Sequence, residues 1–136
     1  MKATVDANIL FSCIIKEGKS RRLWFSPSIN LYAPAFILEE FKKYAPLLLE
    51  KYAGKPADFA GIAEKLLGAV EFVTDNELIP FLPAANSLLE DKKDILYLAC
   101  AIKKDTIIWS NDKGFKRQHR IAAMNTAEMM EEFGML

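Results

Sequence analysis

The sequence is poor in the residues that bind soft metals and has no excess charge of either sign. One His and two Cys among 136 residues argue against a zinc site. Cys13 and Cys100 lie in apolar segments, so we expect reduced thiols in the core rather than a disulfide. The formal net charge is +0, so a nucleic-acid partner would need a local basic patch.

Long apolar runs are also absent. No segment approaches the roughly 18 consecutive apolar residues that span a bilayer. The amino-terminal region meets a charge at Lys2 and again at Asp6, unlike a signal peptide, so we expect a cytoplasmic protein with no membrane contact. Hydrophobic residues make up 51% and charged residues 26% of the chain, a globular balance. The length predicts a single domain over residues 1–136.

Short β-rich segments alternate with longer helical ones, and no internal repeat is present. This alternation predicts an α/β fold with a mainly parallel sheet. The expected strands are Lys2–Val5, Leu31–Ala33, Val70–Thr74, Thr106–Trp109 and Ile121–Met124. The expected helices are Ile9–Lys16, Ser20–Phe25, Ala35–Tyr52 (bent or broken near Pro46), Ala57–Leu67, Ala84–Glu90, Asp94–Lys104 and Thr126–Phe133.

Asp94 is the most informative residue of the chain. At about 100° per residue it shares the apolar side of its helix with Tyr97 and Leu98, and no Lys or Arg lies one turn away, with Lys92 and Lys93 directed elsewhere. An ionised carboxylate in apolar surroundings costs on the order of several kcal/mol unless it is paired, protonated or bound to a cation. The segment also fits a helix start with Asp91 as N-cap and Asp94 in the first turn, so both interpretations remain open.

Two further acids follow expected strands. Asp6 comes directly after the first strand, and Asp112 follows Thr106–Trp109 through Ser110 and Asn111. Ligands of open parallel sheets bind beyond the carboxyl ends of the strands, which favours a functional role. Each acid could instead cap the helix or turn that follows it.

A fourth acid comes from the helix that follows the second strand. Glu40 lies at the border of its apolar stripe, whereas Glu39 projects almost opposite to it and is expected on the surface. Four carboxylates from separate elements would repel one another unless a divalent cation were bound. Oxygen ligands without His or Cys favour Mg²⁺ or Mn²⁺, ions that also bind phosphate. The pattern therefore indicates a phosphodiesterase or nuclease.

Four segments of the chain resemble the acidic motifs of the PIN domain family. They are Thr4–Phe11, Tyr32–Phe41, Lys93–Ala101 and Ile107–Phe115, and together the resemblance covers nearly the whole chain. The resemblance implies a three-layer α/β/α fold and a Mg²⁺- or Mn²⁺-dependent ribonuclease that cleaves single-stranded RNA. By matching position, the acidic, metal-binding and catalytic site would consist of Asp6, Glu40, Asp94 and Asp112.

The resemblance also implies supporting residues and partners. Asn8 and Ser110 match polar positions near the metal, and Asp91 is open to a second-metal or a capping role. The chain looks most like small stand-alone prokaryotic members, many of which resemble VapC toxins. An antitoxin partner and a homodimer are therefore expectations from the family, as is the alternative role of an RNA-processing nuclease.

Two basic stretches are candidates for binding RNA phosphates beside the acidic cleft, although either could be a solvated face. They are Lys16, Lys19, Arg21 and Arg22, and Lys113, Lys116, Arg117, His119 and Arg120. We expect His119 to be exposed or in contact with RNA rather than catalytic.

Other classes of protein also place an aspartate after the first strand. A haloacid-dehalogenase-like phosphotransferase normally needs a second aspartate where this chain has Asn8, and a receiver domain needs a paired acid and a late lysine, for which only Lys113 is near. A non-catalytic RNA-binding PIN module would be expected to lack an acid. A dinucleotide site is excluded because no glycine-rich turn follows the first strand.

Overall fold

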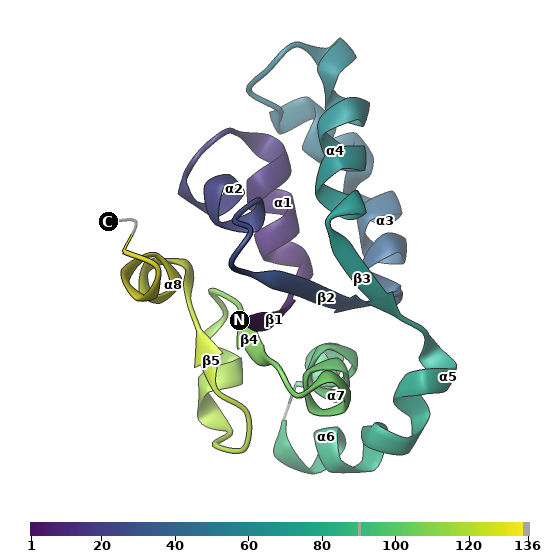
Figure 1. The fold of residues 1–136 in the computed structure, drawn as a ribbon. Helices are drawn as coiled ribbons and strands as arrows, with labels where there is room; N and C mark the ends of the chain where they lie inside the picture. Colours follow the sequence, from purple (N-terminus) through teal and green to yellow (C-terminus); the bar gives the residue numbers. More distant parts are fainter. Residues whose placement is uncertain (90, 135–136) are drawn as a thin grey trace.

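Five short strands form one parallel sheet at the centre of the molecule (Figure 1). The computed structural model describes residues 1–89 and 91–134. The strands are β1 (Lys2–Val5), β2 (Asn30–Pro34), β3 (Val70–Val73), β4 (Ile107–Trp109) and β5 (Ala123–Met124). Their order is β3-β2-β1-β4-β5, and every neighbouring pair is parallel. The expected mainly parallel sheet is confirmed.

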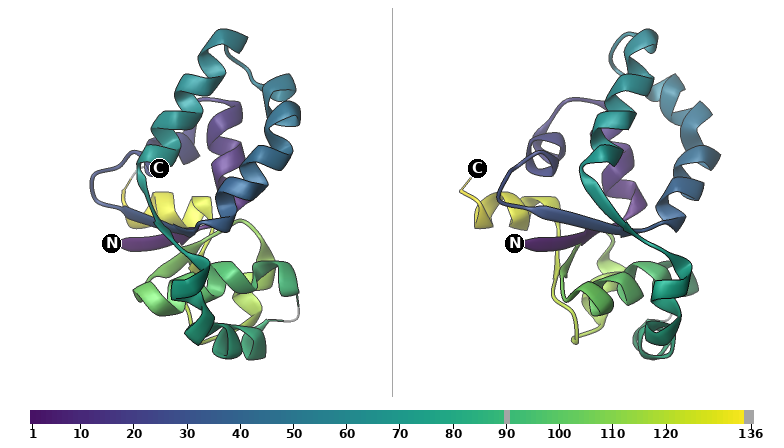
Figure 2. Two further views of the ribbon diagram at one scale, coloured as in Figure 1. Left: turned by 90° about the vertical axis from the view of Figure 1, so that its right-hand side faces the viewer. Right: turned by 45° about the vertical axis from the view of Figure 1, so that its right-hand side comes forward.

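Helices cover both faces of the sheet, which gives the expected three-layer α/β/α arrangement (Figures 1 and 2). One layer holds α1 (Ala7–Ile15), α2 (Lys19–Trp24), α3 (Phe36–Lys51) and α4 (Phe59–Gly68). The other holds α5 (Asp75–Leu78), α6 (Leu82–Leu88) and α7 (Ile95–Lys104), and α8 (Thr126–Glu132) packs against α2. Single 3₁₀ turns occupy Pro56–Asp58, Ile79–Phe81, Lys92–Asp94 and Lys113–Arg117.

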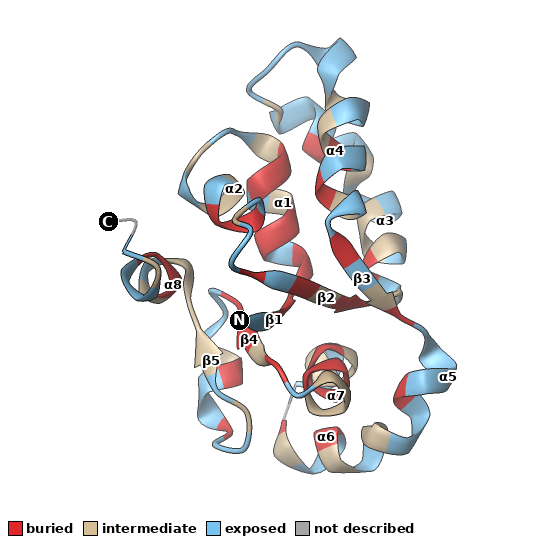
Figure 3. Cartoon of the chain, viewed as in Figure 1, coloured by how far each residue is buried: buried red, intermediate tan, exposed pale blue. Residues whose placement is uncertain are grey.

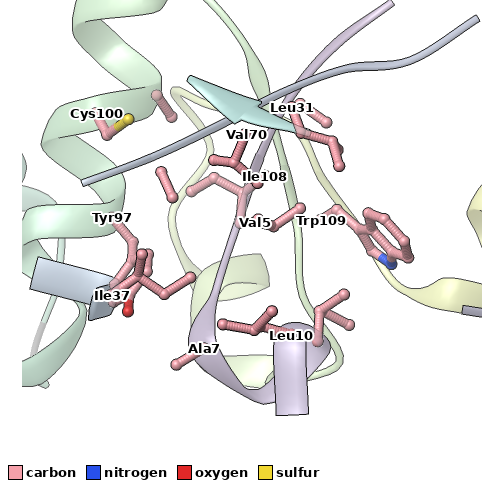
Figure 4. Close-up of a cluster of buried hydrophobic side chains, with 14 of the residues drawn as sticks. Val5, Ala7, Leu10, Leu31, Ile37, Val70, Tyr97, Cys100, Ile108 and Trp109 are labelled. Carbon is pink, nitrogen blue, oxygen red and sulfur yellow. The ribbon is translucent and has the colours of Figure 1, made fainter. Parts of the chain in front are cut away.

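The core lies between the sheet and these two helical layers (Figures 3 and 4). Val5, Ile108 and Trp109 on the paired central strands are fully buried, as is Leu10 on α1. Trp24 contacts Trp109 with a distance of 6.1 Å between ring centroids, and its indole N–H donates to the Leu66 carbonyl at 2.8 Å. Cys13 and Cys100 are buried and not bonded to each other, which confirms their expected place in the core.

The bounds of several helices differ from the expected ones, mainly where hydrogen bonds between residues close in sequence fix a helix end. The α5 helix was not expected, and its start is fixed by a capping box in which Thr74 and Glu77 bond each other's backbone N–H groups. The α3 helix, which was expected to be bent or broken near Pro46, continues through this residue without a break. Pro46 is exposed, so the Lys42 carbonyl that loses its helical partner remains open to water. The expected end of α6 at Glu90 lies outside the described residues.

The order of the strands reverses at β1. The chain moves outward from β1 to β2 and β3, with its helices on one face, and then crosses on the other face to β4 on the opposite side of β1. The loops that leave β1 and β4 therefore diverge to opposite faces, and a crevice opens between them at the carboxyl edge of the sheet. This crevice is where Asp6 and Asp112 emerge.

The described residues include no helix that is both long enough and apolar enough to cross a membrane.

One backbone position predicts a gain in stability. Asp105 ends α7 in the left-handed conformation, with φ 54° and ψ 57°, and places a negative charge at the negative end of the helix dipole. We expect Asp105→Gly to raise the free energy of unfolding by about 1 kcal/mol, because glycine adopts this conformation without steric cost. Thermal melts would test this against Asp105→Ala, which removes the charge but keeps the strain. A glycine variant that melts no higher than the alanine variant would contradict it.

Candidate functional site

A cavity of about 480 Å³ opens at the carboxyl edge of β1 and β4. Within residues 1–89 and 91–134, five carboxylates line it, from the ends of two strands, from α3 and from the 3₁₀ turn before α7. They are Asp6, Glu40, Asp91, Asp94 and Asp112. All four acids expected at the site thus border the same cavity, and Asn8 lines it as well.

Asp6 is held at the back of this cavity by two hydrogen bonds. Its Oδ1 accepts from the backbone N–H of Ile9 at 3.0 Å, which caps α1, and its Oδ2 accepts from the hydroxyl of Ser110. Its side chain is buried, with 5% of the residue exposed. Burial raises the pKa of Asp6, the two hydrogen bonds lower it, and the nearby charges of Asp112 and Glu40 raise it further.

Asp112 is linked to Asp6 through Ser110. The backbone N–H of Asp112 donates to the Ser110 hydroxyl oxygen at 2.9 Å, and Asp112 Oδ1 accepts from the backbone N–H of Gly114 at 2.8 Å. Asn111, which lies between Ser110 and Asp112 in the sequence, accepts a hydrogen bond from the backbone N–H of Thr126 at 2.9 Å, and this bond connects the loop to α8. Asp6 and Asp112 therefore cap the segments that follow them and also border the cavity, so the two interpretations of these residues are compatible.

Glu40 reaches the cavity from α3 and is held by Tyr97 of α7. The phenol O–H of Tyr97, a buried residue, donates to Glu40 Oε1. Burial and this hydrogen bond raise the pKa of the phenol well above its ordinary value, so Tyr97 is a neutral donor. Glu39 is exposed and does not line this cavity, which confirms the distinction drawn between the two neighbours.

Asp94 has no capping role. It occupies the N-cap position of α7 without a side-chain cap hydrogen bond, whereas Asp91 caps the preceding turn by accepting from the backbone N–H of Lys93 at 3.0 Å. Burial raises the pKa of Asp94 from 3.8 to about 6, and the charges of Asp112, Asp91, Asp6 and Glu40 add to this shift. The expected helix start is therefore confirmed, with Asp91 as N-cap and Asp94 in the first turn, and Asp94 makes no cap hydrogen bond of its own.

Lys51 and Lys93 also border the cavity, and neither was expected there. Lys93 was expected to point away, yet it lines the cavity because the 3₁₀ turn changes the angular positions that a continuous α-helix would give. Lys51 lies at the other end of α3, and a spacing of 11 residues returns it to the face of Glu40. The helical spacing of Glu40, Tyr44, Leu47 and Lys51 could have revealed this wall of the cavity.

The first basic stretch follows the far end of α1, where Ile15 still lines the cavity but Lys16, Lys19, Arg21 and Arg22 do not. The Arg21 guanidinium donates to the carbonyls of Cys13 and Ile14 at 2.8 and 3.2 Å, at the carboxyl end of α1. Asp6 caps the amino end of the same nine-residue helix. At 1.5 Å per residue the two ends are about 13 Å apart, so Arg21 lies far from Asp6 and stabilises the carboxyl end of α1.

The second basic stretch is only partly near the cavity. Arg117 lines a smaller hollow together with Asp91 and Asp94. Lys116 forms an ion pair with Glu128 of α8, and His119 is exposed, as expected.

The lining oxygens match the preferences of a hard divalent cation such as Mg²⁺ or Mn²⁺. The raised pKa values of Asp6 and Asp94 arise in part from the mutual repulsion that such a cation would relieve. Within residues 1–89 and 91–134, however, no three His, Cys, Asp or Glu side chains lie close enough together to hold one ion as they are placed. Carboxylate oxygens are suitable ligands for such an ion. To hold one ion together, some of these side chains would have to turn inward.

Comparison with known proteins supports this fold and places the chain in a family. The protein-family model of the PIN domain matches residues 4–133. A comparison with curated proteins finds no match. Among solved structures, the chain is similar to one in the crystal structure of VapBC2 from Rickettsia felis bound to a DNA fragment from their promoter, with 16% sequence identity and a TM-score of 0.68. The match covers 92% of this chain and 98% of that chain, which shows that the two share a fold.

The family model covers almost all of the sequence, and its span includes each of the four acids around the cavity. The chain belongs to the PIN domain family.

Proposed function

We propose that this protein is a divalent-metal-dependent ribonuclease that cleaves phosphodiester bonds of single-stranded RNA. Asp6, Glu40, Asp94 and Asp112 would form its metal-binding and catalytic site. The observation that carries the proposal is the convergence of these four carboxylates, from four separate elements, on one cavity at the point where the strand order reverses.

The metal proposed for this site is Mg²⁺ or Mn²⁺. When bound, such an ion supplies a cation that offsets the carboxylate charge and Lewis acidity toward the oxygens of a phosphodiester. Its ligands would come from the four acids, with Asn8 and Ser110 as hydrogen-bonding neighbours.

The chain itself contributes orientation and charge. Ser110 and the Ile9 N–H fix both oxygens of Asp6, and Tyr97 fixes one oxygen of Glu40, so these two carboxylates cannot rotate freely. Lys51 and Lys93 place positive charge at the border of the cavity, where they could bind phosphate oxygens of the RNA. Apolar side chains, among them Phe11 and Leu48, line the rest of the wall.

The proposed biological setting is cytoplasmic. The protein would act either as the toxin of a toxin–antitoxin pair or as an RNA-processing nuclease, and the solved neighbour of the same fold comes from a VapBC2 complex. We propose an antitoxin protein and a second copy of this chain as partners. A gene for a small protein next to this one would favour the toxin.

Phosphotransfer is not supported as an alternative. The family match excludes a receiver domain, whose strand order of 2-1-3-4-5 differs from the order observed here. A dehalogenase-like enzyme would need an aspartate in place of Asn8. A non-catalytic RNA-binding module remains an outcome of the first experiment below.

We predict that Asp6→Asn or Asp112→Asn reduces Mn²⁺-dependent cleavage of single-stranded RNA at least 100-fold. The expected loss follows because an amide keeps the hydrogen-bond acceptor that caps the next segment but removes the anionic ligand. Cleavage of a labelled oligonucleotide would be followed on gels, with circular dichroism to verify folding.

Asp58→Asn is the matched control, because Asp58 is exposed and makes no side-chain cap hydrogen bond. It should cleave like the parent. A folded Asp6→Asn/Asp112→Asn double variant with full activity would refute the site, and parent activity that survives a chelator would refute the metal. A parent that binds RNA but never cleaves it would indicate the non-catalytic module.

We predict that Asp94→Asn raises the melting temperature of the metal-free protein at pH 7.5 by roughly 3–6 °C. The substitution removes a half-buried charge that four other carboxylates repel. The same variant should lose most of the stabilisation that millimolar Mn²⁺ gives the parent by binding the native state. Melts in chelator and in Mn²⁺ measure both effects; a variant that melts lower in chelator and responds fully to Mn²⁺ would exclude repulsion and ligation together.

The pKa of Asp94 also predicts how this difference depends on pH. Because the folded pKa of about 6 exceeds the ordinary value of 3.8, the folded state binds more protons than the unfolded state between these values. Asp94 therefore destabilises the metal-free protein most above pH 6, and this effect disappears as pH falls below about 4. The difference in melting temperature between Asp94→Asn and the parent should shrink steadily from pH 7.5 to pH 4. A difference that is constant over this range would contradict the assignment.

A further inference from the structure

A second cavity adjoins the carboxylate cavity and carries the opposite charge. It has a volume of about 600 Å³ and lies between the beginning of α3 and the turn that leads into α7. Three lysines line it, and we call it the lysine groove. The residues that line it include Phe36, Lys43, Tyr44, Lys92 and Lys93.

The two cavities share a wall. Glu40, Tyr44 and Lys93 line both of them, so the lysine groove begins where the carboxylate cavity ends. Among the residues that the structure describes, the carboxylate cavity has five acidic side chains against Lys51 and Lys93, whereas the lysine groove has three lysines against two glutamates. The sign of the lining charge therefore reverses across the row of residues that the two cavities share.

Two aromatic side chains line the groove together with these lysines. Phe36 and Tyr44 have 37% and 38% of their surfaces exposed, although residues of this size are normally more buried. The Lys43 ammonium lies 5.3 Å from the centre of the Tyr44 ring, and the Lys92 ammonium donates to Asn86 Oδ1 at 2.6 Å. Exposed rings between cations are the surface on which single-stranded nucleic acids stack their bases and place their phosphates.

We propose that single-stranded RNA leaves the carboxylate cavity through the lysine groove. Its phosphates would bind Lys43, Lys92 and Lys93, and a base next to the cleaved bond would stack on Phe36. The assignment rests on the proposed ribonuclease function, because it takes the carboxylate cavity as the place of cleavage.

The charge reversal favours RNA over a protein segment in the groove. An RNA strand that extends beyond the carboxylates is stabilised by positive charge next to them. The groove provides this charge, beginning with Lys93 in the shared wall. A protein segment would have no such requirement.

Binding of RNA without cleavage tests the groove independently of catalysis. The probe is a fluorescently labelled, unstructured 10-nucleotide RNA, titrated with protein in chelator at several salt concentrations and followed by anisotropy. We expect Lys43→Ala/Lys92→Ala to raise Kd about tenfold or more at low salt. The slope of log affinity against log salt should fall in magnitude by about 1.4, since each lost phosphate contact on a single strand contributes about 0.7.

Phe36→Ala separates stacking from charge. It should raise Kd roughly 5- to 150-fold, as expected for one stacked base, and leave the salt slope unchanged. The matched controls are Lys16→Ala/Lys19→Ala and Phe25→Ala, whose exposed side chains lie along the other basic stretch and its neighbouring hollow. Both controls should bind like the parent.

The possible results distinguish the groove from the nuclease. If the Lys43/Lys92 variant binds RNA with the affinity and salt slope of the parent, the groove is not the RNA path, whether or not the parent cleaves RNA, and a protein occupant becomes the better explanation. If the parent does not bind RNA, the proposal is also overturned. RNA binding that depends on the two lysines in a parent without nuclease activity would support the groove and refute the proposed function.

Discussion

The pairing of β1 with β4 is the constraint on which the site depends. Val5 lies opposite Trp109 in register, and the Asp6 backbone N–H continues the ladder by donating to the Trp109 carbonyl at 3.4 Å. This pairing brings Asp6 next to Ser110, which is 104 positions away in the sequence. A shift of this register by one residue would direct Asp6 to the opposite face of the sheet and separate it from Ser110. The fully buried residues on both strands fix the register, so the core holds the site together.

Most of the fold could be predicted from periodicity, because the strands are short apolar runs and the long helices have clear apolar stripes. The β1 strand has the predicted bounds, and the other strands differ by one or two residues at their ends. The α5 helix was missed although Thr74 and Glu77 have the spacing of a capping box, a signal that lies in the sequence. The 3₁₀ turn Lys113–Arg117 begins at the Asp112 cap. The sequence indicated the cap but not the helical turn that follows it.

The acids of the candidate site could be chosen by position, but their surroundings could not. Tyr97 was placed on the side of Asp94, whereas its bond to Glu40 joins two helices in different layers and is invisible to helical periodicity. The surroundings of the basic residues could not be predicted from the sequence either. Clustering in sequence suggested a phosphate-binding role for Lys16–Arg22, yet Arg21 is occupied by the end of α1, and the lysines near the acids come from α3 and from the turn before α7. Which charges share a surface is decided by how helices pack, and a single sequence contains this information only indirectly.

The two tryptophans are intrinsic fluorescence probes of this protein. Trp24 and Trp109 are the only tryptophans in the chain, both are almost completely buried, and they are in contact with each other. Trp109 directly precedes Ser110, and its indole N–H donates to Thr126 at 3.1 Å, so its surroundings include the loop that carries Asp112. Intrinsic fluorescence therefore reports both the integrity of the core and the arrangement of this loop, without any attached dye.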